Sequence, residues 1–308
     1  MKTAIVTDGK YRMSIAAVRA LSRAGYRVVV TQTRGDAKAA PAVSVSRHCA
    51  QFRWIDGCAA DTEYRERLLS VLQEYEKPVL FCVGAATLNM IAAQREEFAS
   101  FADFLIASKP ILDQLNDKEI VHARAEQLGI PVPKQYDTTP DVFPVVVKPH
   151  CGEKFGLKAA ERYAVAHNAC CESFYDEAMI EQAYQLLHSF GFVGFAMVEF
   201  KGSCILEVNP RVWGSFPMTE ATDSPLVAQY ARAASGQAVQ YTPKDYKVGV
   251  RMRFLLNDTV AILHYLKAGQ IGTALRGMGD VFTAKEALHC KGDNQVFRTY
   301  LKQSLLKR

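Results

Sequence analysis

The sequence lacks the patterns that define several large classes of protein. No apolar run approaches the ~20 residues needed to span a bilayer. The eight cysteines form no Cys-x-x-Cys pair, and no histidine stands at zinc-finger spacing from them. Several lie inside apolar runs, as buried reduced thiols do. The apolar run near the N-terminus is too short for the core of a signal peptide. These absences predict a soluble, cytoplasmic protein with no membrane partner and no structural zinc site.

The chain also lacks a concentrated charge of one sign. Its 37 Lys+Arg against 32 Asp+Glu give a formal charge of +5, and the only basic run is Lys307-Arg308 at the end. A nucleic-acid partner is therefore not expected. Hydrophobic residues make up 49% and charged residues 22%, which are ordinary globular values, and 308 residues allow about two domains.

Strand and helix patterns alternate over the first hundred residues. Apolar runs at 4–7, 27–31 and 79–83 predict buried strands, and amphipathic patterns predict helices from a Ser14 cap to Gly25 and over 64–75. This rhythm predicts a doubly wound parallel sheet. Gly9 stands alone, without the G-x-G-x-x-G pattern of dinucleotide sites, so we expect a structural role for it.

After the first hundred residues, helix and strand patterns no longer alternate regularly. We expect a helix from Asp117 to Gly129, a strand over 143–149 with Lys148 near its end, and a helix over 176–190. The segments 193–200 and 204–208 predict a hairpin across Lys201, Gly202 and Ser203. A three-residue loop would place Phe200 opposite Cys204, and Glu199 on one face with Ile205, Glu207 and Asn209. A two-residue loop would place Glu207 and Glu199 on opposite faces. We predict the three-residue loop.

The hairpin carries acidic residues inside apolar strands, where burial without a partner is costly. Two carboxylates and an amide oxygen on one face would suit one or two hard cations. Alternatively, the carboxylates point to solvent or pair with Arg211. Cationic side chains and a glycine-containing loop over 152–156 precede the hairpin, as a triphosphate site requires, although a plain turn is the simpler interpretation of the loop. The candidate metal ligands are Glu199, Glu207 and Asn209; the candidate phosphate-binding residues are Lys118, Lys148, Lys154 and Lys158, with Arg211 beside them.

These residues occur in motifs that resemble the ATP-grasp superfamily, in particular carboxylate ligases similar to the large subunit of carbamoyl-phosphate synthase. The motifs, in order, are Asn116-Asp117-Lys118, Gly129-Ile130-Pro131-Val132-Pro133, Val147-Lys148-Pro149, Val198-Glu199-Phe200 and Glu207-Val208-Asn209-Pro210-Arg211. The resemblance covers about residues 105–235. It implies an N-terminal α/β domain over 1–108 and a small ATP-grasp subdomain with its linker helix over 109–169. A C-terminal ATP-grasp subdomain with an extension would then occupy 170–308.

The resemblance implies an ATP- and Mg²⁺-dependent carboxylate–amine ligase that acts through an acyl phosphate, with Mn²⁺ as an alternative metal. Small-molecule carboxylates and amines would be its substrates, and a homodimer is one option for its assembly. By position, Lys118 and Lys148 would contact ATP phosphates, and Glu199, Glu207 and Asn209 would hold the metal. Lys148 and Arg211 are the expected catalytic residues, Arg211 as the one that stabilises the acyl phosphate or the transferring phosphoryl group.

The sequence departs from the family in one place. Only a short link, 167–175, stands where the family places most of the lid subdomain and the adenine-binding segment. The lid is therefore expected to be truncated or missing, either because the protein is a naturally reduced variant or because the segment is absent from this sequence. Two alternatives to the ligase follow: a non-catalytic, regulatory nucleotide-binding protein, or an enzyme that forms carbamoyl or acyl phosphate and needs a partner to supply ammonia.

Overall fold

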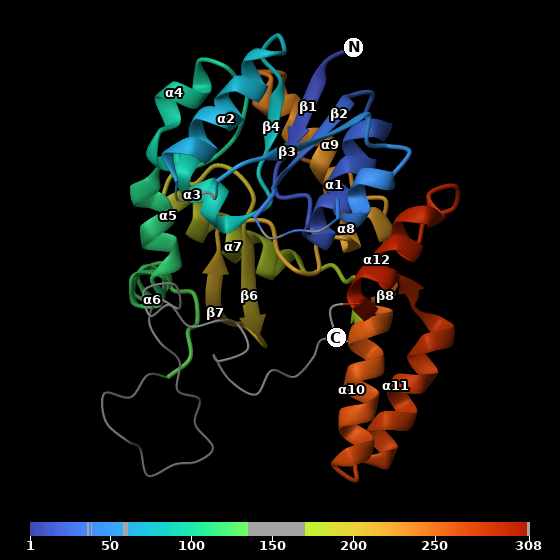
Figure 1. Ribbon diagram of the computed structural model, residues 1–308. Helices are drawn as coiled ribbons and strands as arrows, with labels where there is room; N and C mark the ends of the chain where they lie inside the picture. The colour runs from blue at the N-terminus through green and yellow to red at the C-terminus, as the bar shows by residue number, and fades with distance from the viewer. Residues whose placement is uncertain (36, 38, 58–60, 135–169, 307–308) are drawn as a thin grey trace. The chain divides into compact units, whose positions relative to one another are not determined.

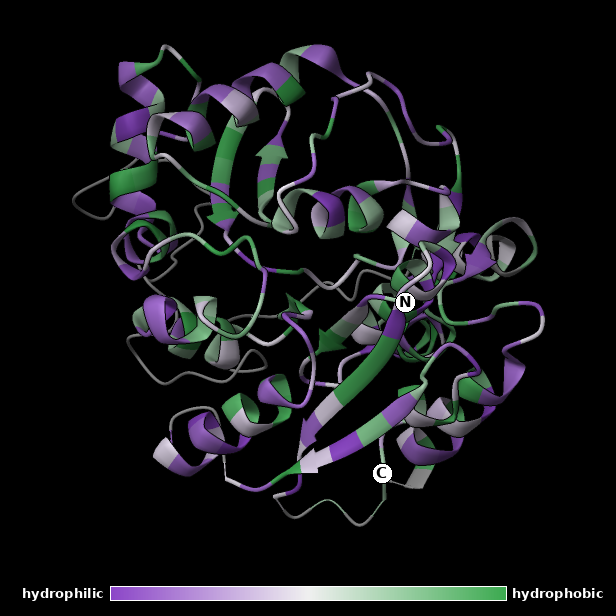
Figure 2. Cartoon of the chain, turned by 90° about the horizontal axis from the view of Figure 1, so that it is seen from above, coloured by the Kyte–Doolittle hydropathy of each residue, from purple (hydrophilic) through white to green (hydrophobic). Residues whose placement is uncertain are grey.

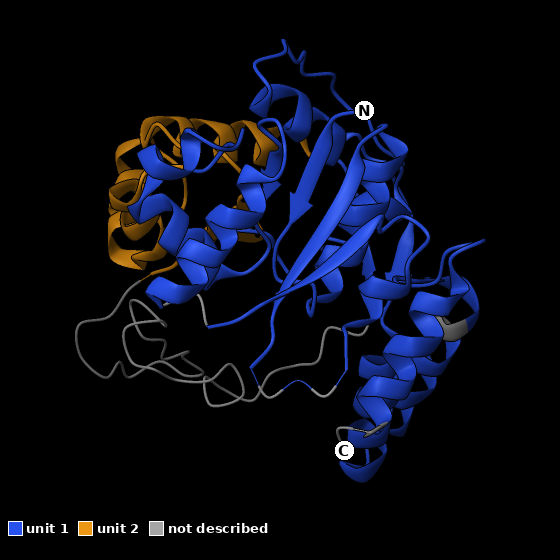
Figure 3. Ribbon diagram, turned by 45° about the horizontal axis from the view of Figure 1, so that its top comes forward, with its two compact units in different colours: residues 1–106, 167–175, 211–308 blue, residues 107–166, 176–210 orange. Residues whose placement is uncertain are grey.

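The computed structural model describes residues 1–35, 37, 39–57, 61–134 and 170–306. The chain divides into two compact units (Figure 3). The first unit comprises Met1–Ile106, His167–Tyr175 and Arg211–Arg308, and the second comprises Ala107–Ala166 and Asp176–Pro210. The three-part division expected at residues 108 and 169 stays a prediction.

A four-stranded parallel sheet forms the centre of the first unit, in the order β3-β2-β1-β4. Its strands are β1 (Thr3–Val6), β2 (Arg27–Thr33), β3 (Gln51–Ile55) and β4 (Val79–Phe81). The strand order reverses direction at β1, as in doubly wound sheets. Ala4, Ile5 and Val6 have no exposed surface, which is typical of a parallel strand covered on both faces. Figure 2 shows the corresponding hydrophobic colour along the central strands.

Helices flank this sheet, with α2, α3 and α4 on one side and α1 and α9 on the other (Figure 1). Their bounds are α1 (Arg12–Arg23), η1 (Ala42–Val45), α2 (Thr62–Gln73), α3 (Ala85–Ala93), α4 (Arg95–Ala99), α8 (Met218–Ala221) and α9 (Leu226–Ala234). The first helix begins two residues before the predicted cap, because Tyr11 is the N-cap residue. The Ser14 hydroxyl instead donates a hydrogen bond to the Asp8 carbonyl at 2.9 Å. The parallel α/β prediction is confirmed.

A carboxylate occupies the junction between β1 and β4. The Asp8 carboxylate accepts hydrogen bonds from the Gly84 N–H and from the Thr87 hydroxyl, both at 3.0 Å, at the start of α3. An anion is favourable there because the first N–H groups of a helix have no partner within it. Gly9 is required for packing, since a Cβ at that position would lie 2.7 Å from a Val30 methyl group. The structural role expected of Gly9 is thus confirmed.

The C-terminal part of the first unit adds a small mixed sheet and three helices. The sheet has the order β5-β8-β9, and α10 and α11 run side by side as an antiparallel pair (Figure 1). The elements are β5 (Cys170–Glu172), β8 (Arg251–Arg253), α10 (Leu255–Lys267), α11 (Ile271–Thr283), β9 (Lys285–Glu286) and α12 (Asn294–Leu306).

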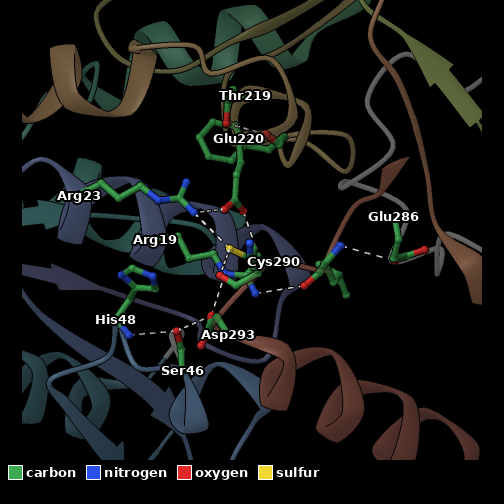
Figure 4. Close-up of polar contacts among 12 residues, drawn as sticks. Arg19, Arg23, Ser46, His48, Thr219, Glu220, Glu286, Cys290 and Asp293 are labelled. Atoms are coloured by element: carbon green, nitrogen blue, oxygen red, sulfur yellow. Dashed lines mark hydrogen bonds and ion pairs between the residues drawn. The ribbon is translucent and has the colours of Figure 1, made fainter. Parts of the chain in front are cut away.

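A buried ion network joins α1 to the segment before α12 (Figure 4). The Arg19 side chain has no exposed surface and donates to Asp293 at 2.8 Å, to Glu220 at 3.2 Å and to the Leu288 carbonyl at 3.0 Å. Arg23 adds a second ion pair to Glu220 at 2.7 Å. Two cations and two carboxylates therefore balance one another, as buried charges must.

The second unit packs three helices against a two-stranded antiparallel hairpin. Its elements are α5 (Lys109–Asn116), α6 (Lys118–Gln127), α7 (Glu177–Ser189), β6 (Met197–Lys201) and β7 (Cys204–Asn209). Leu115, Val121, Leu186 and Ile205 are among the residues that form one hydrophobic core between them. The predicted helices of this unit are confirmed within one or two residues at their ends. The hairpin is also confirmed, but its first strand begins at Met197, four residues after the predicted start at 193.

The expected strand over 143–149 and the segment where the incomplete lid was predicted lie outside the described residues. In the part of the chain that is described, no helix is both long enough and apolar enough to cross a membrane.

Candidate functional site

The register of the hairpin decides where its acidic residues lie. Lys201 pairs with Cys204 and Phe200 pairs with Ile205, so the loop has two residues rather than the predicted three. The register then shifts, and Glu199 lies directly opposite Glu207. The prediction of a three-residue loop is wrong. The two carboxylates nevertheless share a face, because Leu206 is an extra residue that forms a β-bulge and changes the alternation of β7.

The buried residues of the hairpin show which of its two faces packs against the core. Ile205 and Val208 are buried in the core of the second unit, and Val198 and Phe200 of the partner strand pack against the same core. Ile205 and Val208 are three residues apart, so a regular strand would not bury both. The bulge between them returns Glu207 to the opposite face. The prediction that Ile205 shares a face with the acidic residues is also wrong.

The Asn209 amide links the two carboxylates. Its Nδ2 lies 3.1 Å from Oε1 of Glu207 and 3.4 Å from Oε1 of Glu199. All three side chains are half-buried. The three predicted metal ligands are thus brought together in one cluster, which we call the acidic cluster: Glu199, Glu207 and Asn209.

Lys118 reaches the same cluster from the start of α6. Its Nζ lies 3.2 Å from Oε2 of Glu207, and each side chain is 23% exposed. Asp117 fixes the start of this helix, since its carboxylate accepts hydrogen bonds from the N–H groups of Glu119 and Ile120. Lys118 was predicted to bind phosphate; in the structure its ammonium group neutralises a carboxylate at the edge of the acidic cluster.

The remaining predicted residues fall in other places. Lys148, Lys154 and Lys158 lie outside the described residues. Arg211 belongs to the first unit, where it is half-buried and donates a hydrogen bond to the Val212 carbonyl at 3.2 Å. The second unit therefore contributes the acidic cluster and Lys118 by itself.

The donor set of the acidic cluster suits a hard divalent cation. Carboxylate and amide oxygens are the protein ligands that Mg²⁺ uses, usually one or two carboxylates together with water and substrate phosphates. Rotating the Asn209 amide by a half turn would present its oxygen where the NH₂ group now lies. Among the described residues there is no group of three or more His, Cys, Asp and Glu side chains placed to hold a metal. Any metal here would therefore rely on non-protein ligands as well, which is typical of Mg²⁺ and not of structural zinc.

One residue of this site was missed by the sequence analysis. His122 is buried on α6, and its Nε2 lies 2.9 Å from the carbonyl oxygen of Leu206, the bulged residue. The sequence showed an amphipathic helix but gave no sign of a bulge, so nothing marked a histidine one turn after Lys118 as part of the site.

Solved structures that align with this chain include biotin carboxylase domains. A biotin carboxylase–β,γ-ATP complex from Campylobacter jejuni aligns with a TM-score of 0.57 at 14% identity, covering 82% of this chain and 74% of that one. The chain has the fold of a biotin carboxylase domain. The biotin carboxylase domain dimer of Hydrogenobacter thermophilus 2-oxoglutarate carboxylase, in complex with MgADP, ADP and bicarbonate, aligns with a TM-score of 0.56 at 13% identity, over 82% of this chain and 73% of that one.

The biotin carboxylase fold also occurs inside longer chains. In Rhizobium etli pyruvate carboxylase the match has a TM-score of 0.53 at 12% identity and covers 81% of this chain but 29% of that one. The sequence itself matches no protein-family model and no curated protein. The predicted ATP-grasp resemblance is confirmed for the fold alone, and the resemblance to the large subunit of carbamoyl-phosphate synthase stays a prediction.

Proposed function

We propose that this protein is an ATP- and Mg²⁺-dependent carboxylate ligase that forms a C–N bond. The observation that carries the proposal is the acidic cluster, in which two carboxylates and an amide meet on one face with Lys118 at its edge. The biotin carboxylase fold supports it, because solved members of that fold hold β,γ-ATP and MgADP.

Glu199, Glu207 and Asn209 would hold Mg²⁺, and Mn²⁺ would be accepted by the same oxygen donors. When bound, the metal supplies positive charge against the phosphate oxygens of ATP. Lys118 pairs with Glu207 at the edge of the cluster. Its ammonium group would bind a phosphate oxygen once the metal replaces it as the counter-ion of Glu207. Lys148, Lys154 and Lys158 would complete the phosphate-binding set.

The proposed chemistry has two displacements. A carboxylate oxygen of the substrate attacks the γ-phosphorus and releases ADP, which gives an acyl phosphate. An amine then attacks the acyl carbon, loses a proton and expels inorganic phosphate. Lys148 and Arg211 are the proposed catalytic residues: Lys148 binds the transferring phosphoryl group, and Arg211 stabilises it or the acyl phosphate. The protein's contribution is positioning and charge stabilisation, as in other phosphoryl transfers.

The experiment is release of ADP and phosphate against a panel of carboxylates and amines. Wild-type protein is expected to turn over with at least one pair, and Glu207→Gln is expected to lower the rate by at least ~100-fold, since even residues behind a metal ligand change activity by 10–100-fold. Glu126→Gln, on the exposed face of α6, is the matched control. An unchanged rate in Glu207→Gln would refute the metal assignment. ATP binding without turnover on any pair would favour the regulatory nucleotide-binding alternative.

We also propose that the protein is a homodimer in which the α10–α11 pairs of two copies meet. Apolar side chains on this pair are exposed, Phe282 to 90%, and those of α11 are spaced four, three and four residues apart, as in the seam between helices of a bundle. They are Leu263, Leu266, Ile271, Leu275, Met278 and Phe282. Together they expose roughly 600 Å² per copy, so two copies would bury about 1,200 Å², the lower bound of a stable interface.

Sedimentation measurements test the homodimer. The expected result is a dimer for the wild type and a monomer for Leu275→Glu, because a buried carboxylate in the seam has no partner. Thr273→Glu places the same charge on the opposite side of α11 and is expected to leave the dimer intact. A monomeric wild type at micromolar concentration would contradict the proposal.

A further inference from the structure

The β-bulge in β7 is held by a side chain from another element. The extra residue of a bulge is left out of the hydrogen-bond ladder, so its backbone groups need partners elsewhere. The Leu206 carbonyl finds one in the imidazole of His122, at 2.9 Å. A carbonyl oxygen only accepts hydrogen bonds, so Nε2 of His122 carries the proton in this contact.

The neighbouring backbone group is satisfied from the same direction. The Ile205 N–H donates to the Pro131 carbonyl at 2.9 Å, just after the end of α6. The bulge is therefore fixed on two consecutive residues by α6 and the turn that follows it. The contacts are shielded from water, since His122 is only 8% exposed and Ile205 is fully buried, and a buried hydrogen bond is costly to leave unmade.

Helix α6 also contacts Glu207, the residue of β7 that follows the bulge. Lys118 and His122 are four residues apart, so they project from one face of α6. Lys118 meets the Glu207 carboxylate and His122 meets the Leu206 carbonyl. Two successive residues of β7, Leu206 and Glu207, are thus held by one face of α6. With Leu206 held as the bulged residue, Glu207 lies opposite Glu199 in the hairpin.

We propose that His122 is a positioning residue for the metal site: it holds the bulge at Leu206 and thereby keeps Glu207 aligned with Glu199 and Asn209. This inference rests on the proposed function, since it assigns those three residues to a metal. His122 touches neither the metal nor the substrate in this account. It acts through the backbone of the residue that precedes a metal ligand, as partners behind the ligands of a metal site do.

Three substitutions separate the hydrogen bond from the volume of the side chain. His122→Gln keeps an N–H donor at about the reach of Nε2, whereas His122→Asn has a donor that is too short, and His122→Leu has none. Leu186→Val, in the hydrophobic core that also holds Ile205 and Val208, controls for general loss of packing. If His122→Leu does not fold, the Gln and Asn pair still makes the comparison.

The probe is Mn²⁺ in the presence of ATP, with free Mn²⁺ measured by electron paramagnetic resonance. We expect His122→Asn and His122→Leu to weaken Mn²⁺ binding by roughly 10- to 100-fold, the range found for residues behind metal ligands. His122→Gln should remain within a few-fold of wild type, and Leu186→Val should show no weakening. Equal Mn²⁺ affinity in wild type and His122→Asn would overturn the inference.

Hydrogen exchange of the β7 amides gives a readout that does not depend on metal. Faster exchange around Leu206 in His122→Asn, but not in His122→Gln, is expected. If wild type binds no Mn²⁺ while this pattern holds, the proposed function fails and the role of His122 in holding the bulge stands. If exchange is equal in all variants, His122 does not hold the bulge and the inference fails whatever the metal result.

Discussion

Asp293 joins the segment before α12 to α1, and its removal is the sharpest test of how the first unit is held together. Its carboxylate accepts hydrogen bonds from Arg19 at 2.8 Å, from the Ser46 hydroxyl at 2.8 Å and from the Arg47 N–H at 3.0 Å (Figure 4). The Asp293→Ala substitution leaves the Arg19 guanidinium buried with one carboxylate, Glu220, in place of two.

The expected loss in free energy of unfolding follows from this imbalance of charge. Removing one partner of a buried ion pair costs about 3–5 kcal/mol. The lower end applies here, because Arg19 keeps Glu220 and the Leu288 carbonyl as partners. With a urea slope near ~3 kcal/mol per molar, a loss of about 3 kcal/mol lowers the unfolding midpoint by about 1 M.

The assay is urea unfolding followed by tryptophan fluorescence. The two tryptophans, Trp54 and Trp213, both lie in the first unit, so the signal reports the unit that contains the network. Glu63→Ala removes an exposed ion pair to Arg67 and is expected to change stability by under ~0.5 kcal/mol. If Asp293→Ala unfolds at the same urea concentration as that control, the network does not hold the unit together.

The pH dependence of the network has a defined sign. Burial alone would raise the pKa of Asp293, but hydrogen bonds from Arg19, Ser46 and the Arg47 N–H outweigh burial and lower it. A lowered folded-state pKa gives stability that is present above the unfolded pKa of ~3.9 and is lost as the pH falls through the folded value. The midpoint difference between wild type and Asp293→Ala should therefore persist from pH 7 to about pH 5 and shrink below about pH 4.

Three further outcomes are expected from other parts of the first unit. Tyr230→Phe removes a buried hydroxyl that donates to the Leu80 carbonyl at 3.0 Å, so it should cost ~1–2 kcal/mol in urea unfolding. Gly84→Ala would place a Cβ 2.6 Å from the Asp8 carboxylate, and the forced shift should cost ~1–3 kcal/mol in the same assay. Burial raises the pKa of Cys49 to about 11, so peptide mapping should show slow iodoacetamide labelling of this thiol at pH 8 and faster labelling above pH 10; rapid labelling at pH 8 would contradict that burial.

The N-terminal sheet was readable from the sequence because its strands are short, apolar and separated by helix patterns. A buried parallel strand such as 4–6 could be recognised without its partner strands, because it is short and apolar and helix patterns follow it. Helix ends were less certain. Tyr11 rather than Ser14 is the N-cap residue of α1, and no side chain caps that helix, so the sequence carried no capping signal there.

The acidic cluster was found for a reason that was only partly right. Glu199, Glu207 and Asn209 do meet, but through a two-residue loop and a bulge rather than through a three-residue loop. The bulge forms because the core buries both Ile205 and Val208, whereas the regular alternation of a strand would place them on opposite faces. It also depends on α6, which is distant in sequence, so neighbouring residues alone did not reveal it.

The network around Arg19 could not be predicted either. Its members come from α1, from residues 46–47, from α8 and from the segment before α12. In the sequence, the charged members Arg19, Glu220 and Asp293 look like ordinary surface charges. Only the fold brings them together and removes them from water.

The proposed reaction begins with phosphoryl transfer from ATP to a carboxylate. It is tested most directly with ¹⁸O in both oxygens of whichever carboxylate supports ADP release, by measuring the mass of the inorganic phosphate formed together with the ligated product. An acyl phosphate requires one ¹⁸O atom to pass from the carboxylate into each phosphate. We therefore expect singly labelled phosphate in equal amount to product, formed at least ~100-fold more slowly by Glu207→Gln. Phosphate without ¹⁸O would refute the acyl-phosphate route, because the phosphoryl group would then have gone to water rather than to the carboxylate.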